Sequence, residues 1–344
     1  MEQTDVQVRY FSSPYISFHR AAGAYRWCLR RMGHVVHNRD ADGDVVILHG
    51  EPQDFAGVLQ ARRPPPGRPV VGYVAWEHGV LGAAQRQGLA LVDEVWVPSR
   101  FCRDRLAPYH GNIHVVPHVV APPLAHADAG AWLRDQLGDP PGTFHFYAIT
   151  RPDDPRKNLA ATLEAFARLS SERSLCLVVK AAPGFSFKGA APPGVRVFEG
   201  VWNSQRLNAL HHLGRVFVNS HRAEGWGLGI TEAMALGRIV VATGYGGNMD
   251  YMNAANAFPL LWRPVPVPSE VLPEPAFAPN EVAGQTWAEV DGDALAKAMQ
   301  DALDRWEDLG AMRRAAAAAM LAFSPPNIAK VLQRRLEALA PGAG

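Results

Sequence analysis

Short apolar runs alternate with stretches of helical periodicity along the first half of the chain. Runs rich in Val and Ile occur at residues 6–11, 44–48, 69–74, 94–97 and 113–116. Between the first two runs, residues 20–32 place Tyr25, Cys28, Leu29 and Met32 on one side, as an amphipathic helix does. Nearly continuous apolar strands are typical of parallel sheets covered on both faces. Their alternation with helices predicts right-handed βαβ units in an α/β fold.

The alternating pattern pauses and then starts again. Residues 117–129 contain turn residues without a clear period, and residues 139–142 (Asp-Pro-Pro-Gly) form a strong stop signal. We expect further strands at 143–149, 175–179, 195–198, 216–218 and 239–242, and helices at 158–169, 205–212 and 230–236. The sequence therefore predicts two consecutive α/β halves, with the boundary between about residues 120 and 142. We assign residues 1–130 to the first domain, 131–322 to the second and 323–344 to a closing helix.

Two segments near the end of the chain depart from this pattern. Residues 263–280 contain six prolines and predict a long loop, which is either a surface excursion or a functional flap; we favour the excursion. After Pro325 and Pro326 the apolar positions have helical spacing, which predicts an amphipathic helix. Its cations Lys330, Arg334 and Arg335 fit a solvated face better than a membrane surface.

Length and composition limit the class of protein. A chain of 344 residues is long enough for about two domains. Hydrophobic residues make up 48% of it, which supports a sizeable core and excludes disorder as a description of the whole chain. The net charge of +1 argues against a dedicated nucleic-acid binder, because such proteins usually carry a basic excess.

The ends of the chain, its apolar runs and its cysteines suggest a cytoplasmic protein. Residues 1–9 show no apolar signal-peptide core, and no apolar run reaches the roughly 20 residues needed to span a bilayer. We expect membrane contact to be peripheral at most. The three cysteines, Cys28, Cys102 and Cys176, lie far apart and form no Cys-x-x-Cys pair, so their spacing suggests neither a zinc site nor a disulfide framework.

The most informative stretch for chemistry is residues 218–250, in which a predicted strand is followed by a glycine-rich turn and a helix. Free backbone N–H groups at such a helix N-terminus can bind an anion, and glycines allow close approach of a ligand. Glu224 precedes the helix and Glu232 lies in its first turns, so both can face one cleft. Carboxylates suit the vicinal hydroxyls of a ribose or a hexose. A simple capping turn remains the alternative from spacing alone.

This stretch resembles a known signature. The segment EGWGLGITEAMALG, from Glu224 to Gly237, resembles the Glu-x7-Glu block of retaining glycosyltransferases of family 4, which have the GT-B fold. Residues 151–159, 72–77, 93–99, 241–250 and 287–289 resemble further segments of that family, and the likeness extends over roughly residues 65–340. The resemblance implies two Rossmann-like domains that face a cleft, with the C-terminal helix packing back toward the N-terminal domain.

The resemblance also implies roles on the donor side. Arg151 and Lys157 would hold the donor diphosphate, Glu232 would bind the ribose hydroxyls, and Val201 would lie near the base. Glu224 would hold the transferred sugar together with the backbone of Gly225, Trp226, Gly227 and Leu228. Elementary electrostatics supports the two cations, because a departing nucleoside diphosphate gains charge that nearby cations stabilise. Without the resemblance, a solvated Arg151 and Lys157 would be the simpler interpretation.

The acceptor side is less well defined by the sequence. His49 stands where the family often places a histidine at the end of an N-domain strand, and Glu77 where many members have an acidic residue. Many members carry a Gly-Gly loop after the first strand, whereas this chain has Ser12-Ser13-Pro14-Tyr15. The hydroxyl of Ser13 is therefore a candidate for replacing a backbone contact, or the acceptor differs.

Several other signals do not point to a site. Asp40 and Asp42 resemble a metal-binding Asp-x-Asp, but the rest of an EF-hand loop is missing, and we expect no metal and no cofactor in the reaction. His211 and His212 lie on a helix without a third ligand in the nearby sequence, which favours packing over zinc. Neither a dinucleotide-binding GxGxxG after the first strand nor a P-loop nor a GxSxG elbow is present.

We therefore expect a retaining glycosyltransferase, metal-independent and bacterial, that moves a sugar from a UDP- or GDP-linked donor to a sugar or lipid-linked hydroxyl acceptor. Its expected setting is the synthesis of a polysaccharide, glycolipid or glycoside. Two alternatives stay open at this stage: a sugar-nucleotide epimerase on the same scaffold, and a non-catalytic carbohydrate-binding subunit.

Overall fold

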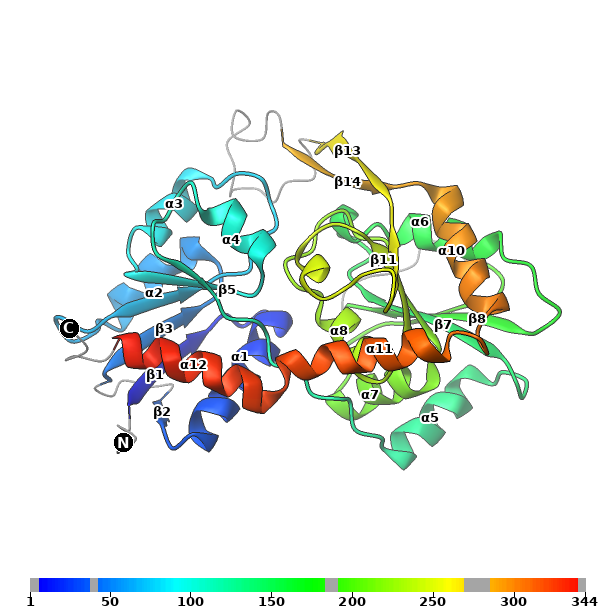
Figure 1. The fold of residues 1–344 in the computed structure, drawn as a ribbon, viewed down its shortest axis with the longest axis horizontal. Coiled ribbons are helices and arrows are strands. Elements are labelled where there is room, and N and C mark those ends of the chain that lie inside the picture. The colour runs from blue at the N-terminus through cyan, green and yellow to red at the C-terminus, as the bar shows by residue number, and fades with distance from the viewer. Residues whose placement is uncertain (1–5, 38–42, 183–190, 269–284, 340–344) are drawn as a thin grey trace. The chain divides into compact units, whose positions relative to one another are not determined.

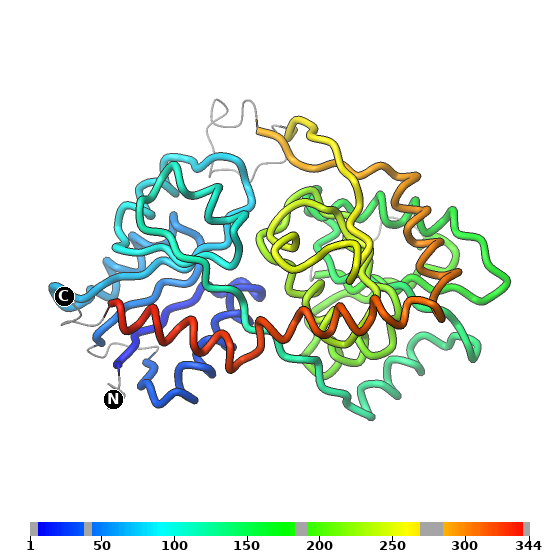
Figure 2. Tube along the Cα trace, in the orientation of Figure 1, coloured from blue at the N-terminus to red at the C-terminus, as the bar shows by residue number. Residues whose placement is uncertain are grey.

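A computed structural model describes residues 6–37, 43–182, 191–268 and 285–339 (Figure 1). The chain forms two compact units. The first unit contains residues Met1–Val119, Pro266–Thr286 and Ala322–Gly344, and the second contains Val120–Val265 and Trp287–Leu321. Each unit is described separately, and Figure 2 traces the chain through both.

The first unit is built on a parallel sheet in the order β2-β1-β3-β4-β5-β6. Its strands are β1 (Gln7–Ser12), β2 (Val35–His37), β3 (Val45–His49), β4 (Val70–Tyr73), β5 (Glu94–Val97) and β6 (Ile113–Val115). Its helices are α1 (Ile16–Arg31), the 3-10 turn η1 (Pro52–Asp54), α2 (Phe55–Ala61), α3 (Ala83–Leu89), α4 (Arg100–Leu106) and α12 (Pro325–Leu339). Every residue of β3 is buried, as the continuous apolar run predicts.

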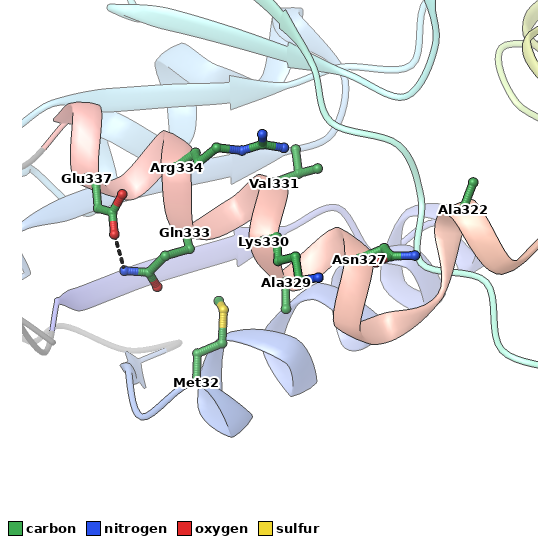
Figure 3. A pocket seen from close by; sticks show the side chains of 9 residues that line it. All are labelled: Met32, Ala322, Asn327, Ala329, Lys330, Val331, Gln333, Arg334 and Glu337. Carbon is green, nitrogen blue, oxygen red and sulfur yellow. Dashed lines mark hydrogen bonds between the residues drawn. The ribbon is translucent and has the colours of Figure 1, made fainter.

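The C-terminal helix α12 packs on the first unit, as the sequence predicts. Its apolar residues Ile328, Leu332 and Leu336 are buried in one cluster with residues of α1, β1, β3 and β4. Arg335 links α12 to the sheet, because its guanidinium Nε donates to the buried carboxylate of Glu94 on β5 at 2.9 Å. Lys330 and Arg334 are exposed and line an open depression along α12, as predicted for a solvated face (Figure 3). Arg335 does not belong to that face, because its side chain is half-buried in the pair with Glu94.

The second unit repeats the parallel architecture in the order β12-β11-β10-β7-β8-β9. Its strands are β7 (Phe144–Thr150), β8 (Leu175–Ala181), β9 (Val195–Phe198), β10 (Val216–Asn219), β11 (Ile239–Thr243) and β12 (Phe258–Leu260). Its helices are α5 (Ala127–Leu137), α6 (Leu159–Ala167), α7 (Ser204–Leu213), α8 (Leu228–Ala235), α10 (Gly292–Asp304) and α11 (Gly310–Met320), with 3-10 turns η2 (Pro155–Lys157) and η3 (Gly247–Asp250). A further 3-10 turn, η5 (Leu321–Phe323), begins in this unit and ends in the first. Side chains of α6 and α10 pack with β7 and β8 in one large core.

Two sequence predictions need correction. The sequence predicts a linker around residues 117–129, yet α5 begins at Ala127, because its apolar Leu133 and Leu137 find a buried face in the second unit. The predicted proline-rich loop also begins later than expected. Residues Trp262–Pro266 form β13, which pairs with β14 (Thr286–Val290), while residues 269–280 lie outside the described part of the chain. Asp40 and Asp42 lie outside it as well.

The helical segment Gly310–Leu339 is long and apolar enough, by length and composition, to cross a membrane. Its mean hydropathy reaches 1.2 over 18 residues, although the sequence shows no uninterrupted apolar run of that length. The segment is not one uniform helix, since η5 separates α11 from α12. Met320 is buried in α11 and Leu332 in α12, so each part uses its apolar face for packing within a folded unit.

Candidate functional site

The strand order of the second unit places a crevice between two loops. In the order β9-β8-β7-β10-β11-β12, the chain passes from β7 to β8 and β9 toward one edge of the sheet. It then passes from β10 to β11 and β12 toward the other edge. In open parallel sheets, ligands bind outside the carboxyl ends of the strands at such a switch point. The loop after β7 contains residues 151–158, and the loop after β10 contains residues 220–227. A small hollow lies under them, lined among others by Thr150, Lys157 and Ser220.

The loop after β7 has a strained and well-anchored backbone. Asp154 caps the 3-10 turn η2 by accepting from the backbone N–H of Arg156 at 3.0 Å. Asn158 then adopts φ 51°, in the left-handed region that residues other than glycine seldom occupy. The buried hydroxyl of Ser220, from the loop after β10, donates to the Asn158 carbonyl at 2.8 Å. The two loops therefore hold each other in a fixed arrangement.

Lys157 and Glu224 meet between these loops. The Lys157 ammonium Nζ lies 2.7 Å from Glu224 Oε2, and the two side chains are only 20% and 12% exposed. Arg156 adds a second cation, since its Nη1 donates to the carbonyl of Ala223 at 3.1 Å. The structure thus brings together two of the residues that the sequence singles out, although 67 positions separate them.

The Glu224 carboxylate is charged at all ordinary pH values. Burial by itself would raise the pKa of this carboxyl group, but the positive charges of Lys157 and Arg156, with His221 beside them, outweigh burial and lower the pKa to about 2. His221 is fully buried, and burial lowers its pKa to about 4, so its imidazole is neutral. Its Nε2 bonds to the Tyr245 carbonyl at 2.8 Å. Sequence reasoning missed His221, although its place between a strand end and a glycine turn was a usable signal.

Glycines make room around Glu224. Gly246 has φ 110°, and a Cβ at that position would meet the Glu224 carbonyl oxygen at 2.4 Å. The N–H of Gly247 donates to the same carbonyl at 2.7 Å. Gly227 has φ 92° and is the N-cap residue of α8, where as a glycine it has no side chain to cap the helix. The positive end of α8 is therefore directed at the carboxyl edge, where an anion or a sugar hydroxyl can approach the backbone.

The turn also contains a buried tryptophan. Trp226 is 2% exposed and its ring lies 4.9 Å from the ring of Tyr251, whose hydroxyl donates to the Trp226 carbonyl. Gly225 and Gly227 flank Trp226, and Leu228 is the first residue of α8. The buried tryptophan thus fixes the path of the turn instead of offering its side chain to a ligand.

Glu232 has a different set of contacts. Its Oε2 lies 3.2 Å from Nε2 of His211 on α7, and Nδ1 of that histidine lies 3.0 Å from the hydroxyl of Tyr147 on β7. His211 is completely buried, whereas the Glu232 side chain is 19% exposed. When Nδ1 of His211 accepts from the Tyr147 hydroxyl, its Nε2–H donates to Glu232 and so orients this carboxylate. The sequence treats His211 as a packing residue, because its partner comes from a helix 21 positions away.

Arg151 and Val201 lie at the surface of the same unit. The Arg151 guanidinium pairs with Asp153 at 3.0 Å, and both side chains are more than half exposed, so this pair is readily exchanged for another anion. Val201 is 72% exposed in the loop after β9. Beneath that loop, the buried ammonium of Lys180 donates to the Gly200 carbonyl at 2.7 Å, a contact that sequence reasoning did not identify. Burial lowers the pKa of Lys180.

The predicted acceptor-side residues belong to the first unit. Its strand order also changes direction, between β1 and β3, and Ser13 and His49 lie at the ends of these two strands. The N–H of Ser13 donates to the His49 carbonyl at 2.8 Å. Glu77 lies four residues beyond the end of β4. The structure thus brings Ser13 and His49 together at one switch point.

His49 is part of a buried aromatic cluster. Its Nδ1 lies 2.8 Å from the Tyr10 hydroxyl, and its ring lies 4.2 Å from the ring of Tyr73 and nearly parallel to that of His118. Burial, together with the charges of His118 and Arg26, lowers the pKa of His49 well below its usual value. The imidazole is therefore neutral and suited to hydrogen bonding with a hydroxyl.

A larger hollow of the first unit does not bear chemistry of this kind. The open depression between α1 and α12 has a volume of about 750 Å³ and is lined by Met32, Ala322, Asn327, Ala329, Lys330, Val331, Gln333, Arg334 and Glu337. Figure 3 shows the Gln333 amide donating to the Glu337 carboxylate along the helix. The volume of a hollow therefore does not identify the candidate site. Groups with shifted pKa values that contact one another, as around Glu224, are the better indicator.

Residues 143–263 are similar to a known protein family. This segment matches the family model described as Glycosyl transferases group 1. It contains both loops at the β7–β10 switch point, from Arg151 to Lys157 and from Ser220 to Leu228. No curated protein gives a significant sequence match.

Solved structures with the same fold cover nearly the whole chain. A glycosyltransferase from Rickettsia africae is 11% identical with a TM-score of 0.73 and covers 99% of this chain and 100% of its own. The Anabaena protein HepE, in complex with UDP and glucose, is 14% identical with a TM-score of 0.67 over 97% of this chain and 100% of its own. WaaG, a glycosyltransferase involved in lipopolysaccharide biosynthesis, is 13% identical with a TM-score of 0.61 over 98% of this chain and 100% of its own. The two parallel-sheet units have the GT-B fold, as predicted.

Proposed function

We propose that this protein is a glycosyltransferase that moves a sugar from a nucleotide-sugar donor to a hydroxyl acceptor. The observation that carries the proposal is the largely buried Lys157–Glu224 pair at the β7–β10 switch point. It lies within the segment that matches the group 1 glycosyl transferases. A cation and an ionised carboxylate at one crevice suit a donor that has an anionic diphosphate and a polyhydroxylated sugar.

The charges suggest how the donor side works. Lys157 and Arg151 stabilise the negative charge that develops on the departing diphosphate, for which Arg151 exchanges its exposed partner Asp153. Glu224, ionised and hydrogen-bonded to Lys157, accepts hydrogen bonds from hydroxyls of the transferred sugar. Glu232, oriented by His211, accepts from the ribose hydroxyls. Val201 lies near the base.

The reaction is proposed to retain the anomeric configuration. The acceptor oxygen forms a bond to the anomeric carbon while the bond from that carbon to the diphosphate oxygen breaks. The acceptor's proton passes to the departing diphosphate on the same face, so no protein nucleophile is needed. The pairing of Glu224 with Lys157 supports this proposal, because a carboxylate held by an ammonium is a poorer nucleophile.

Further details of the proposal concern substrates and setting. The donor is UDP- or GDP-linked, and HepE, whose structure is known with UDP-glucose, supports the UDP form. The acceptor is a sugar or lipid-linked hydroxyl near Ser13, His49 and Glu77. No metal acts in the reaction, and the protein works in a bacterial cytoplasm with at most peripheral membrane contact. WaaG supports a role in making a cell-surface polysaccharide or glycolipid.

Two measurements test this function. A thermal-shift screen against UDP-, GDP- and dTDP-sugars identifies the donor, because a ligand that binds only the folded protein raises its melting temperature. Nucleoside diphosphate release is then measured with candidate acceptors, with Lys157→Met as the inactive control. Conversion of the donor without an acceptor would identify an epimerase instead. Absence of both a thermal shift and turnover with every donor would favour a non-catalytic subunit.

A further inference from the structure

A second cluster of chemically active side chains lies in the second unit. Asp139, His145 and Cys176 present a carboxylate oxygen, an imidazole nitrogen and a thiol sulfur that all lie within 4.8 Å of one another. His145 Nε2 and Asp139 Oδ2 are 3.0 Å apart. Cys176 and His145 are buried, and Asp139 is partly buried. Nothing in the proposed transfer reaction uses these three residues.

The fold creates this cluster from distant parts of the sequence. His145 on β7 and Cys176 on β8 are direct partners in the parallel register, so their side chains stand next to each other on one face of the sheet. Their neighbours Phe144, Phe146 and Leu177 point into the core on the other face. Asp139 follows Gly138, which ends α5 in a left-handed conformation with φ 60° and turns the chain toward the sheet.

The cluster is separate from the proposed donor site. His145 is the second residue of β7, whereas the donor loop begins after Thr150 at the opposite end of the strand. Five residues of extended chain span about 16 Å. A ligand held by Asp139, His145 and Cys176 therefore cannot contact a group bound at Lys157.

The donor set and its geometry suit a tetrahedral metal ion. In a zinc site with bonds of about 2.0–2.3 Å, neighbouring ligand atoms are about 3.3–3.6 Å apart. The three atoms here need only small shifts to reach that spacing, because they already lie within 4.8 Å. One thiolate and one carboxylate would neutralise a divalent cation, which favours binding at a site of low exposure. The side chains of His145 and Asp139 are 10% and 14% exposed, so solvent reaches the edge of the cluster and a water would supply the fourth ligand.

We propose that Asp139, His145 and Cys176 bind a thiophilic divalent cation, with Zn²⁺ the best fit, through three protein ligands and one water. Binding replaces the thiol proton by the metal and releases that proton to solvent. The ion ties the turn at residues 139–142 to β7 and β8 and so stabilises the second unit. Sequence spacing does not reveal the site, because its ligands come from three separate elements.

The alternative is a metal-free hydrogen bond between Asp139 and His145 beside a protonated thiol. In the absence of a metal, burial and the nearby Asp139 raise the pKa of Cys176 to about 12, so its thiol is protonated. This state is compatible with both interpretations, since a bound cation displaces such a proton. A direct binding measurement decides between them.

Cobalt is the probe for the test. Purified full-length protein, freed of metal with a chelator, is titrated with Co²⁺, whose bond to a thiolate gives an intense near-ultraviolet charge-transfer band. We expect one equivalent to produce that band together with the visible bands of tetrahedral cobalt. Zn²⁺ added afterwards should abolish both, because it displaces cobalt from tetrahedral sites containing sulfur.

Matched variants assign the signal to the three residues. Cys176→Ser should remove the band, and His145→Gln and Asp139→Asn should each weaken Co²⁺ binding at least about a hundredfold. Cys28→Ser, which changes another buried thiol, should leave the titration unchanged. A wild-type protein without a band, or a band that persists in Cys176→Ser, would overturn the proposal. If Cys176→Ser fails to fold, the Asp139→Asn and His145→Gln titrations decide, and unchanged affinity in both would equally overturn it.

Discussion

Removing the Lys157 ammonium should destabilise the protein because it leaves a buried carboxylate without its nearest cation. The pKa of Glu224 falls from an ordinary value of 4.5 to about 2. A shift of about 2.5 units corresponds to about 3 kcal/mol of interaction at 1.36 kcal/mol per unit. Arg156 and His221 contribute part of it. We therefore expect Lys157→Met to lower the free energy of unfolding at pH 7 by about 2 kcal/mol.

The sign of the pH dependence follows from the lowered pKa. Glu224 stabilises the folded state fully above pH 4.5, and this contribution is lost as the pH falls toward 2. Measurements at pH 7 therefore record the whole effect. A double-mutant cycle measures the coupling by urea unfolding of Lys157→Met, Glu224→Gln and the double variant. The double variant should regain much of the free energy of unfolding that Lys157→Met alone loses.

An exposed ion pair supplies the matched control. Lys297 lies 2.7 Å from Asp301, the same distance as in the buried pair, but its side chain is 74% exposed. Lys297→Met should cost less than about 0.5 kcal/mol. If Lys157→Met cost no more than Lys297→Met, or if the two buried substitutions were additive, the coupling inferred for Lys157 and Glu224 would be refuted.

Three further predictions concern pH, metals and the C-terminal helix. Burial lowers the pKa of His221 from 6.5 to about 4, so the neutral imidazole contributes fully to folding stability above pH 6.5, and this stability is lost as the pH falls toward 4. Urea unfolding should therefore show a free energy of unfolding that decreases between pH 6.5 and 4, and His221→Gln should reduce this decrease. An unchanged pH dependence in His221→Gln would contradict the lowered pKa. Initial transfer rates should survive excess EDTA in wild type and in Cys176→Ser alike, and a loss in both that Mn²⁺ or Mg²⁺ restores would show that the reaction needs a metal. Arg335→Met should destabilise the first unit by about 3 kcal/mol, since Glu94 is 2% exposed, while leaving nucleotide affinity unchanged by calorimetry; unaltered hydrogen exchange in α12 would contradict this role of Arg335.

The sequence predicts the larger elements of the fold well. The apolar runs that become β3, β7, β8 and β11 are long, and they are continuous because both faces of each sheet are covered. The seven-residue helices α2, α3 and α4 carry too few turns to show a period, and the sequence does not predict them. The sequence does not predict helix α5, because prolines and small residues surround it. Its apolar face is recognised only from the packing of Leu133 and Leu137 in the second unit.

The candidate site is predicted only in part, for a physical reason. Lys157 and Glu224 were both singled out by the resemblance, but their ion pair depends on two loops that the sheet brings together. The sequence predicts only a packing role for His211, because its partner Glu232 comes from α8. Cys176 gains its neighbours in the same way, through strand register. Sequence patterns identify chemistry within one segment, whereas contacts between segments require the fold.

Calorimetry on two glutamate variants tests the central claim most directly. Glu232 is proposed to hold the ribose, which nucleoside diphosphate and intact donor share, and Glu224 to hold the sugar, which only the donor has. Losing a charged hydrogen-bond partner costs roughly 1.5–3 kcal/mol, or about ten- to a hundredfold in affinity. Glu232→Gln should therefore weaken both ligands equally, while Glu224→Gln should leave nucleoside diphosphate affinity nearly unchanged and reduce turnover severely. If Glu224→Gln weakened the bare nucleotide as much as Glu232→Gln did, the proposed arrangement of the donor would be contradicted.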